Sequence, residues 1–339
     1  MYSKKWFIPI FILSLPLLSS IFIYGNKLVA AQFNGGLAII TAENVNQLQR
    51  LEVVANLVSS GQIVYSPSGD YLAVGTESGV QIYAETLNSE FQLMETDAPV
   101  YSVTFSSDGL QLAGGDYEGN IYLWDMANHQ AIGIFNAYEN DVIVWKLAFF
   151  DNNDLLMSLG GSSVKVWDLA SRTNITTIRN PEYPISAAIP DTFGSFIIIV
   201  DSNGSLHIFD SDSGKNQLSL QRNLGGFDLQ LSPDQSILAS AGVRQVTLLD
   251  WETSDLITKL EASSEAISDI AFNADGTLMA TGDTKGKIRI WDVQNLTELI
   301  NLANGDSEIL SLAFSPDGLT LISNDIDGIV HVWGIPADD

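Results

Sequence analysis

Apolar and polar positions repeat in seven short segments of the chain, of which "KIRIWD" (287–292) is typical. In each segment the residues one and three before the strand end are apolar, and the residue between them is polar or amphipathic. Alternation with a period of two, repeated in register, predicts β-strands. The expected strand ends recur every 40 to 43 residues, at Tyr83, Trp124, Trp167, Phe209, Leu249, Trp291 and Trp333.

A second apolar run precedes each of these strands, as in "LMATGD" (278–283), and a tight turn precedes that run, clearest in "FSPDG" (314–318). Pro, Asp and Gly supply the backbone angles and the local hydrogen bond that such turns need. An inner strand is expected before each turn, and an outer strand after each strand end. Four short strands in each repeat of this length predict the blades of a β-propeller.

The last blade lacks an outer strand, because only six residues follow Trp333. The segment "LQRLEVV" (48–54) is expected to supply that strand and to close the ring, which removes exposed sheet edges. The predicted fold class is therefore all-β, a seven-bladed β-propeller closed by an N-terminal strand. The expected boundaries are a lead-in at 32–46, one propeller domain at 47–335 and a tail at 336–339.

The chain resembles the WD-repeat family over about residues 40–335. The resemblance rests on the period, on the "FSPDG" turns and on the signature residues Trp124, Asp125, Trp167, Asp168, Trp291, Asp292 and Trp333. The lead-in "TAENVNQLQRL" is similar to that of exported or membrane-anchored bacterial WD-repeat proteins. The family's Gly-His signature is absent from every blade, so the hydrogen-bond set of His, Ser, Asp and Trp is not expected. The blades should then depend more on apolar packing.

The first 31 residues have the parts of a secretory signal. Lys4 and Lys5 precede an uncharged apolar stretch at 6–25, and "VAA" (29–31) supplies a small-residue end. The apolar stretch is about long enough to cross a bilayer, so either cleavage after Ala31 or a retained anchor is possible. Both alternatives predict an exported protein, secreted or anchored at the outer side of the cytoplasmic membrane. The membrane is expected as a partner only through an uncleaved N-terminal segment.

Charge and cysteine content exclude several functions. Asp and Glu number 41 against 15 Lys and Arg, a net charge of −26. This balance argues against nucleic acid as a partner, because a phosphate backbone requires basic surface. The chain has no cysteine, which excludes disulfides, thiolate nucleophiles and cysteine-bound metals.

Catalytic and cofactor motifs are absent from the sequence. There is no nucleophile elbow, zinc-binding HExxH, phosphate loop or dinucleotide fingerprint. His207 and His331 occupy the polar position of the repeat, and His129 lies in a turn, so a metal site with three or four ligands is not expected. The acid-rich stretches at 151–154 and 209–214 lack the spacing of a calcium loop. The prediction is no enzyme, no cofactor and no metal.

One repeated position suggests a binding surface. Four residues before the inner-strand aromatic, the predicted rim carries Tyr101, Trp145, Ile185, Phe227 and Leu310, with Gly61 and Ser268 completing the column. These positions should lie where the inner strands begin at one mouth of the channel. Large apolar residues there are typical of interaction hot spots. The alternative is that they plug the channel mouth or pack between blades.

We therefore expect a non-enzymatic scaffold that binds a protein or peptide of unknown identity through the propeller rim. Acidic loops at Glu139, Asp141, Asp306 and Glu308 would steer the partner. An alternative is a receptor for a small molecule or glycan, in which Tyr101, Trp145 and Phe227 form a stacking platform. A propeller hydrolase or redox enzyme is a less favoured alternative, because it requires ionisable groups or metal ligands that converge near the axis.

Overall fold

The computed structural model describes residues 36–54, 59–84, 92–139, 142–180, 182–191, 194–303 and 305–337. Within these ranges the regular structure is β-strand, apart from one 3-10 turn, η1 (Val45–Gln47). The predicted all-β class is therefore confirmed. The expected signal segment at 1–31 lies outside the described residues, as does Asp141.

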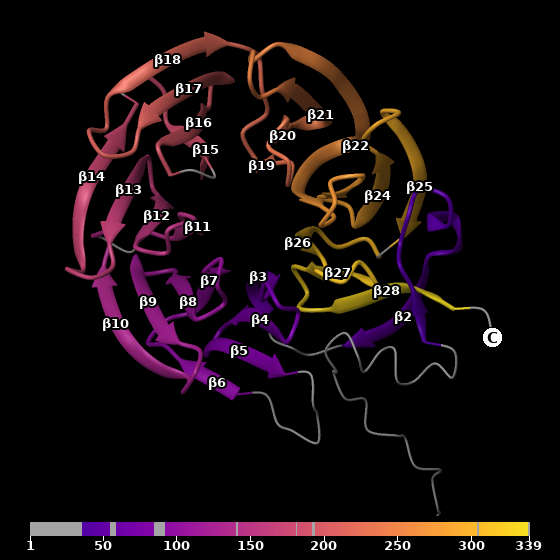
Figure 1. Cartoon of the computed structure of the whole chain (residues 1–339), viewed down its shortest axis with the longest axis horizontal. Coiled ribbons are helices and arrows are strands. Elements are labelled where there is room, and N and C mark those ends of the chain that lie inside the picture. Colours follow the sequence, from indigo (N-terminus) through magenta and orange to yellow (C-terminus); the bar gives the residue numbers. More distant parts are fainter. Residues whose placement is uncertain are drawn as a thin grey trace, which may run out of the picture.

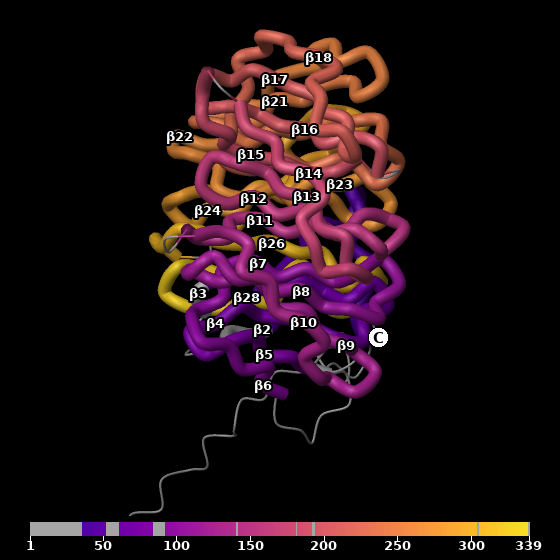
Figure 2. Tube along the Cα trace, turned by 90° about the vertical axis from the view of Figure 1, so that its left-hand side faces the viewer, coloured from indigo at the N-terminus to yellow at the C-terminus, as the bar shows by residue number. Residues whose placement is uncertain are grey.

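Antiparallel sheets stand around a central axis like the blades of a propeller (Figures 1 and 2). Four of the sheets have four strands each, which succeed one another from the axis outwards in sequence order. They comprise β3 (Ser59–Tyr65), β4 (Tyr71–Thr76), β5 (Gly79–Ala84) and β6 (Gln92–Glu95); β7 (Val100–Phe105), β8 (Gln111–Asp116), β9 (Asn120–Asp125) and β10 (Gln130–Asn136); β11 (Val144–Phe149), β12 (Leu155–Gly160), β13 (Ser163–Asp168) and β14 (Thr173–Arg179); and β15 (Ile185–Pro190), β16 (Phe196–Asp201), β17 (Ser205–Asp210) and β18 (Asn216–Gln221).

A fifth sheet has seven strands because one long strand belongs to two neighbouring sets. The first part of β22 pairs with β21 and its last part pairs with β23, the change falling between Ala266 and Ile267. The predicted count of seven blades stays a prediction. The strands of this sheet are β19 (Asp228–Leu231), β20 (Ile237–Ala241), β21 (Val243–Asp250), β22 (Leu256–Phe272), β23 (Leu278–Asp283), β24 (Lys287–Asp292) and β25 (Thr297–Ala303).

The last sheet joins the two ends of the described chain. It contains β26 (Ile309–Phe314), β27 (Thr320–Asp325) and β28 (Val330–Pro336), and β1 (Leu37–Ala38) and β2 (Gln49–Val54) both pair with β28. Arg50 is the register partner of Trp333, so the expected pairing of residues 48–54 with this strand is confirmed. The Ser311 hydroxyl donates to the Ile63 carbonyl at 3.2 Å, which links β26 to β3 and completes the ring.

Part of the expected lead-in packs on the ring. Ile40 and Val45 are buried in the same apolar cluster as Leu278 and Trp333. Asn44 fixes the turn between them, because its side-chain oxygen accepts from the Thr41 backbone N–H at 2.8 Å. Parts of the lead-in from residue 37 onwards therefore pack on the propeller, and the expected boundary at residue 47 stays a prediction.

The tryptophan signature is structural, as the sequence indicates. The indole N–H of Trp167 donates to Ser158 at 2.9 Å, and those of Trp291 and Trp333 donate to Thr281 and Ser323, both at 3.1 Å. These bonds satisfy donors that are buried between sheets. Gly114 holds the corresponding position beside Trp124, where a Cβ atom would approach the ring to 2.9 Å.

The aspartates of the signature terminate the same strands. Asp125, Asp168 and Asp292 each accept a hydrogen bond from a backbone N–H in the following turn, at 2.6 to 2.7 Å. The Ser171 hydroxyl and then its backbone N–H hold the pKa of Asp168 below its usual range. The backbone N–H of Asn295 and then its side-chain amide do the same for Asp292. Their role is to fix the turn that leads to the outer strand.

His331 is a buried histidine in the closing strand β28. Its ring stacks on Trp333 at 6.0 Å between centroids, and neither ring nitrogen has a hydrogen-bond partner among the described residues. Burial, with a smaller contribution from the charge of Arg50 on β2, lowers its pKa to about 4. The imidazole is therefore neutral at pH 7, and charging it within the fold is unfavourable.

We predict that His331 makes the ring less stable in mild acid. Between about pH 6.5 and pH 4 the unfolded chain binds a proton at this residue and the folded chain does not, so the free energy of unfolding falls as the pH falls, by about 1–3 kcal/mol. The variant His331→Gln, which places here the residue found at the equivalent Gln81, should lack this part of the pH dependence. Urea denaturation of both proteins at pH 7 and pH 4.5 measures the difference, and parallel losses in the two would contradict the assignment.

Candidate binding site at the channel mouth

The inner strands begin at one end of the axis, and most of them carry a β-bulge there. The ladder register shifts between Val100 and Ser102 in β7, and equivalent shifts in β11 and β26 fall at Trp145 and Leu310. A bulge leaves one residue unpaired and re-aims its side chain. The bulges therefore direct Tyr101, Trp145 and Leu310 to the channel mouth, as the sequence column predicts.

Four of the five predicted rim residues line one pocket of about 120 Å³, namely Tyr101, Trp145, Phe227 and Leu310. The ring of Tyr101 meets that of Trp145 edge to face, at 5.2 Å between centroids and 82°. Such an arrangement is favourable for aromatic pairs. Trp145 remains 43% exposed and Phe227 55% exposed, so their faces are accessible.

The fifth residue, Ile185, does not lie at the mouth. It is 5% exposed and packs in the apolar cluster between β11–β14 and β15–β18. The bulge of β15 falls at its neighbour Ser186, which lines the pocket. The rim position was located by counting four residues back from the aromatic residue of each inner strand. In this strand Pro190 stands in place of the aromatic residue, so the predicted rim position is one residue too early.

The floor of the pocket is charged. The Lys146 ammonium on β11 forms an ion pair with Asp228 on β19, with Nζ and Oδ1 2.9 Å apart. The intervening strand β15 has the small residue Ala187 at the equivalent place, and Ala187 also lines the pocket. The lysine side chain therefore reaches past one sheet to the next.

Asp269 on β22 completes this group. Its Oδ2 accepts from the Leu312 backbone N–H at 2.6 Å. Burial raises the pKa of Asp269 well above its usual range, the charge of Asp228 raises it further, and Lys146 lowers it. For Lys146, burial lowers the pKa, but the two carboxylates outweigh burial and the net shift is upward. The ammonium is thus held in its charged form between two acids.

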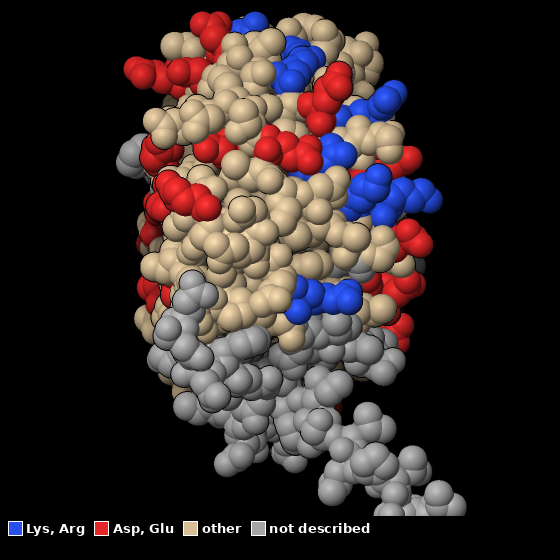
Figure 3. All heavy atoms as spheres, turned by 90° about the vertical axis from the view of Figure 1, so that its right-hand side faces the viewer, with Lys and Arg blue, Asp and Glu red and all other residues tan. Residues whose placement is uncertain are grey.

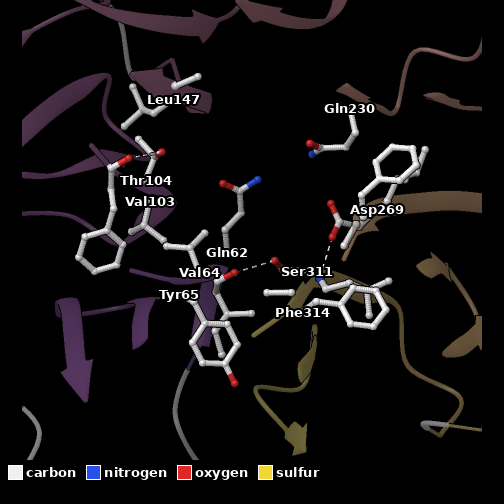
Figure 4. A pocket seen from close by; sticks show the side chains of 18 of the residues that line it. Gln62, Val64, Tyr65, Val103, Thr104, Leu147, Gln230, Asp269, Ser311 and Phe314 are labelled. Carbon is white, nitrogen blue, oxygen red and sulfur yellow. Dashed lines mark hydrogen bonds between the residues drawn. The ribbon is translucent and has the colours of Figure 1, made fainter. Parts of the chain in front are cut away.

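Below this floor lies the axial channel, a cavity of about 530 Å³ lined by the inner strands. Gln62, Lys146 and Asp269 line both the channel and the mouth pocket, so the two hollows adjoin. Figure 4 shows Gln62 and Gln230 pointing into the channel from opposite sides, and the Asp269 carboxylate facing the same space. The mouth is therefore aromatic, and a few polar side chains face a largely apolar channel beneath it.

Lys146, Asp228 and Asp269 were not predicted from the sequence. Each is the residue after the rim position, in the inner strands "VWKLAF", "DLQL" and the end of β22. Charged residues in otherwise apolar inner strands are the signal that could have identified them. Together they are three ionisable groups near the axis, which is what a propeller enzyme would require. However, the Lys146 ammonium is paired with Asp228 and its pKa is raised, so this lysine is not a free base or nucleophile.

The histidines do not form a metal site in the described part of the chain. His207 pairs with Asp201 at 2.9 Å, His331 is buried beside Trp333, and His129 adopts a left-handed turn conformation with φ of 57°. No group of three possible ligands was found among the residues described. In the acid-rich stretch at 209–214, Asp210 accepts from the Ser213 backbone N–H, which is turn chemistry.

Two family models match this chain. Residues 77–209 match a β-propeller family described as "Nucleolar protein 10-like, N-terminal domain". Residues 254–292 and 297–334 each match "WD domain, G-beta repeat". WD repeats and a β-propeller domain are therefore present, which confirms that part of the resemblance.

The chain is similar to several eukaryotic proteins. Striatin of Mus musculus is 22% identical over 223 residues, 59% of this chain and 28% of the mouse protein. The "U3 small nucleolar RNA-associated protein 15 homolog" of Gallus gallus is 24% identical over 236 residues, 68% of this chain and 45% of that protein. The "Pre-rRNA-processing protein crb3/ipi3" of Schizosaccharomyces pombe is 22% identical over 249 residues, 67% of this chain and 54% of that protein. The match thus spans from about a quarter to about half of each of these relatives.

These similarities correct two predictions. The relatives are eukaryotic, so the resemblance to exported bacterial WD-repeat proteins is not supported. The expected location outside the cytoplasmic membrane is wrong, because similar proteins carry nucleolar and pre-rRNA-processing names. In the part of the chain that the structure describes, no helix has the length and apolar character needed to cross a membrane.

We predict that the Lys146–Asp228 pair is required for stability. The variant Lys146→Met leaves two buried carboxylates without their cation, and should lower the free energy of unfolding by about 3 kcal/mol. The double variant Lys146→Met/Asp228→Asn removes one of those charges, and should recover at least half of the loss. Urea denaturation at pH 7 measures both. Equal losses in the single and double variants would show that the uncompensated charge is not the cause.

Proposed function

We propose that this chain is a non-enzymatic interaction scaffold that binds a protein or peptide through the mouth face of its ring. In this proposal residues 47–335 form one domain of seven blades. The two-part pairing of β22 supports that count, because it divides the seven-stranded sheet into two sets of four that share this strand. The comparisons support the scaffold role, since the similar proteins include WD-repeat propellers such as Striatin.

The observation that carries the proposal is a group of exposed large apolar side chains around the mouth. It comprises Trp145, Tyr183, Phe227, Val243 and Ile326, all in the turns or strand starts at this end of the ring. Phe227 stands between the mouth pocket and a second hollow of about 440 Å³, which runs past Ser186 to Val243. Aromatic residues beside concavities are typical anchors of protein interfaces.

A second candidate function is a receptor for a small molecule or glycan. It is favoured by the presence of Tyr101, Trp145 and Phe227 in one accessible pocket. The mouth pocket itself, at 120 Å³, lies well below the roughly 300–1,000 Å³ of typical ligand pockets, and only the adjoining channel and the hollow beside Phe227 reach that range. The pocket is better matched to one side chain of a larger partner.

We predict that the mouth aromatics carry partner binding. The single variants Trp145→Ala and Phe227→Ala should each weaken binding of a captured partner by more than about 1 kcal/mol, because these residues are accessible anchors. Their stability should change by less than about 0.5 kcal/mol, as is usual for surface substitutions. The partner is first captured with the full chain, and its affinity for each variant is then measured by calorimetry.

Leu110→Ala is the matched control, since Leu110 is 59% exposed but lies in the turn between β7 and β8 at the opposite end of the ring. It should leave the affinity unchanged. An equal loss in the control, or none in the two mouth variants, would reject the mouth face as the binding surface. Competition by a monosaccharide or another small molecule, with no protein partner captured, would support the receptor instead.

A further inference from the structure

Charge is distributed very unequally around the ring. The sequence contains no Lys or Arg between Arg50 and Lys146, and none after Arg289. These two stretches, 51–145 and 290–339, carry thirteen and nine Asp or Glu residues. They are far apart in sequence but adjoin in space, because β26 contacts β3 and β3 contacts β7. One continuous sector of the ring is therefore acidic with no basic residue from β3 to β10.

The remaining sector contains the basic residues. Figure 3 views the ring from the side of β22 to β25, and shows blue Lys and Arg side chains at the upper end and on the right-hand half, with red Asp and Glu along both edges and between them. Eleven of the twelve Lys and Arg residues beyond residue 32 fall within 146–289. The same stretch, 146–289, also holds eighteen Asp or Glu residues, so only the bases are unequally distributed. The field is therefore most negative over the sector without bases, and this sector attracts a positively charged partner.

At the mouth face the acidic sector presents six exposed carboxylates, which we call the acidic arc. They lie in successive turns at the mouth end of the ring: Glu77, Asp97, Glu118, Glu139, Asp306 and Asp327. None of them takes part in the ion pairs formed by the described residues. Glu139 interacts electrostatically with Lys165 without forming an ion pair.

The buried carboxylate of Asp269 provides a second, independent reason to expect a cation at the mouth. It is 7% exposed and lines both the mouth pocket and the channel. It accepts from the Leu312 backbone, but no side chain of the described residues donates a hydrogen bond or forms an ion pair with it. A carboxylate has acceptor positions for about four donors, and the backbone N–H groups of Leu312 and Ile270 occupy two of them, so positions remain for a donor that enters the pocket.

The aromatic walls of the pocket also suit a positively charged side chain. A side chain that enters from the mouth passes Tyr101, Trp145 and Phe227 before it reaches Asp269. Aromatic faces attract cations, and the long alkyl stem of a basic side chain packs well on apolar rings. Lys146 already occupies this environment from within, with its ammonium beside a buried carboxylate.

We propose that the mouth binds a basic segment of a partner protein, whose lysine or arginine side chain enters the pocket toward Asp269 while neighbouring positive charges lie over the acidic arc. This inference rests on the proposed function and specifies the chemistry of the partner. The pocket supplies the specific contact, and the arc supplies orientation and a faster association.

The test uses fluorescein-labelled Gly-Ser peptides with evenly spaced lysines, and a matched peptide with glutamine at the same positions, titrated into the full chain at low and at physiological salt. The lysine peptide should bind and the glutamine peptide should not. Asp269→Asn should weaken binding by at least about tenfold, because a charged hydrogen bond is lost. The arc variant Glu77→Gln/Glu118→Gln/Asp306→Asn should weaken it by about tenfold at low salt and less at physiological salt, where exposed charges are screened.

The matched control is Asp154→Asn/Asp212→Asn/Glu252→Gln, which removes three exposed acids at the opposite end of the ring and should have little effect. Equal binding of both peptides, or an equal loss in the control, would overturn the proposal. Loss in the arc variant with none in Asp269→Asn would overturn the pocket assignment. If the lysine peptide fails to bind while Trp145→Ala still weakens a captured partner, the inference fails and the proposed function stands.

Discussion

The structure depends on the closure of the ring between its two ends. An antiparallel sheet left open exposes unpaired N–H and C=O groups along its edge, and a row of separate sheets would also expose an apolar face at each end. Here β2 pairs with β28, and the Ser311 hydroxyl bonds to the Ile63 carbonyl across the junction of β26 and β3. When this junction forms, the second strand from the axis in each set of four is covered on both faces by neighbouring sheets. This explains the complete burial of β23 and β27.

Closure also decides where the chain can carry function. Inner strands from every sheet converge on one axis, and the bulge at the start of most of them points one side chain at the mouth. Residues that are about 40 positions apart in sequence become neighbours at the mouth, whereas the apolar residues farther along the repeats pack between neighbouring sheets. Variation at this position changes the mouth without changing the packing between sheets.

The sequence predicted the fold well because its information is local and repeated. Alternation, turn chemistry and the Trp-Asp spacing identify the strands, and the missing outer strand after Trp333 identifies its replacement at 48–54. The rim column predicted four of the pocket residues, and it failed at Ile185 because Pro190 shifts the count by one. The expected export had a different basis, an apolar N-terminal stretch that lies outside the described residues, and the comparisons contradict it.

The contacts among the charged residues of the pocket floor could not be predicted in the same way. They form between inner strands of different sheets that ring closure brings together, and no single repeat shows them. Lys146 and Asp228 are 82 residues apart, and the ion pair forms only because β15 contributes the small Ala187 between them. Asp269 joins them from a third strand, and its pKa is raised first by burial and then by the charge of Asp228, while Lys146 lowers it. A buried pair of this kind adds little net stability compared with apolar packing. Its position at the base of an aromatic pocket therefore favours a role in recognition, where a fixed charge at a fixed depth selects which side chain can enter.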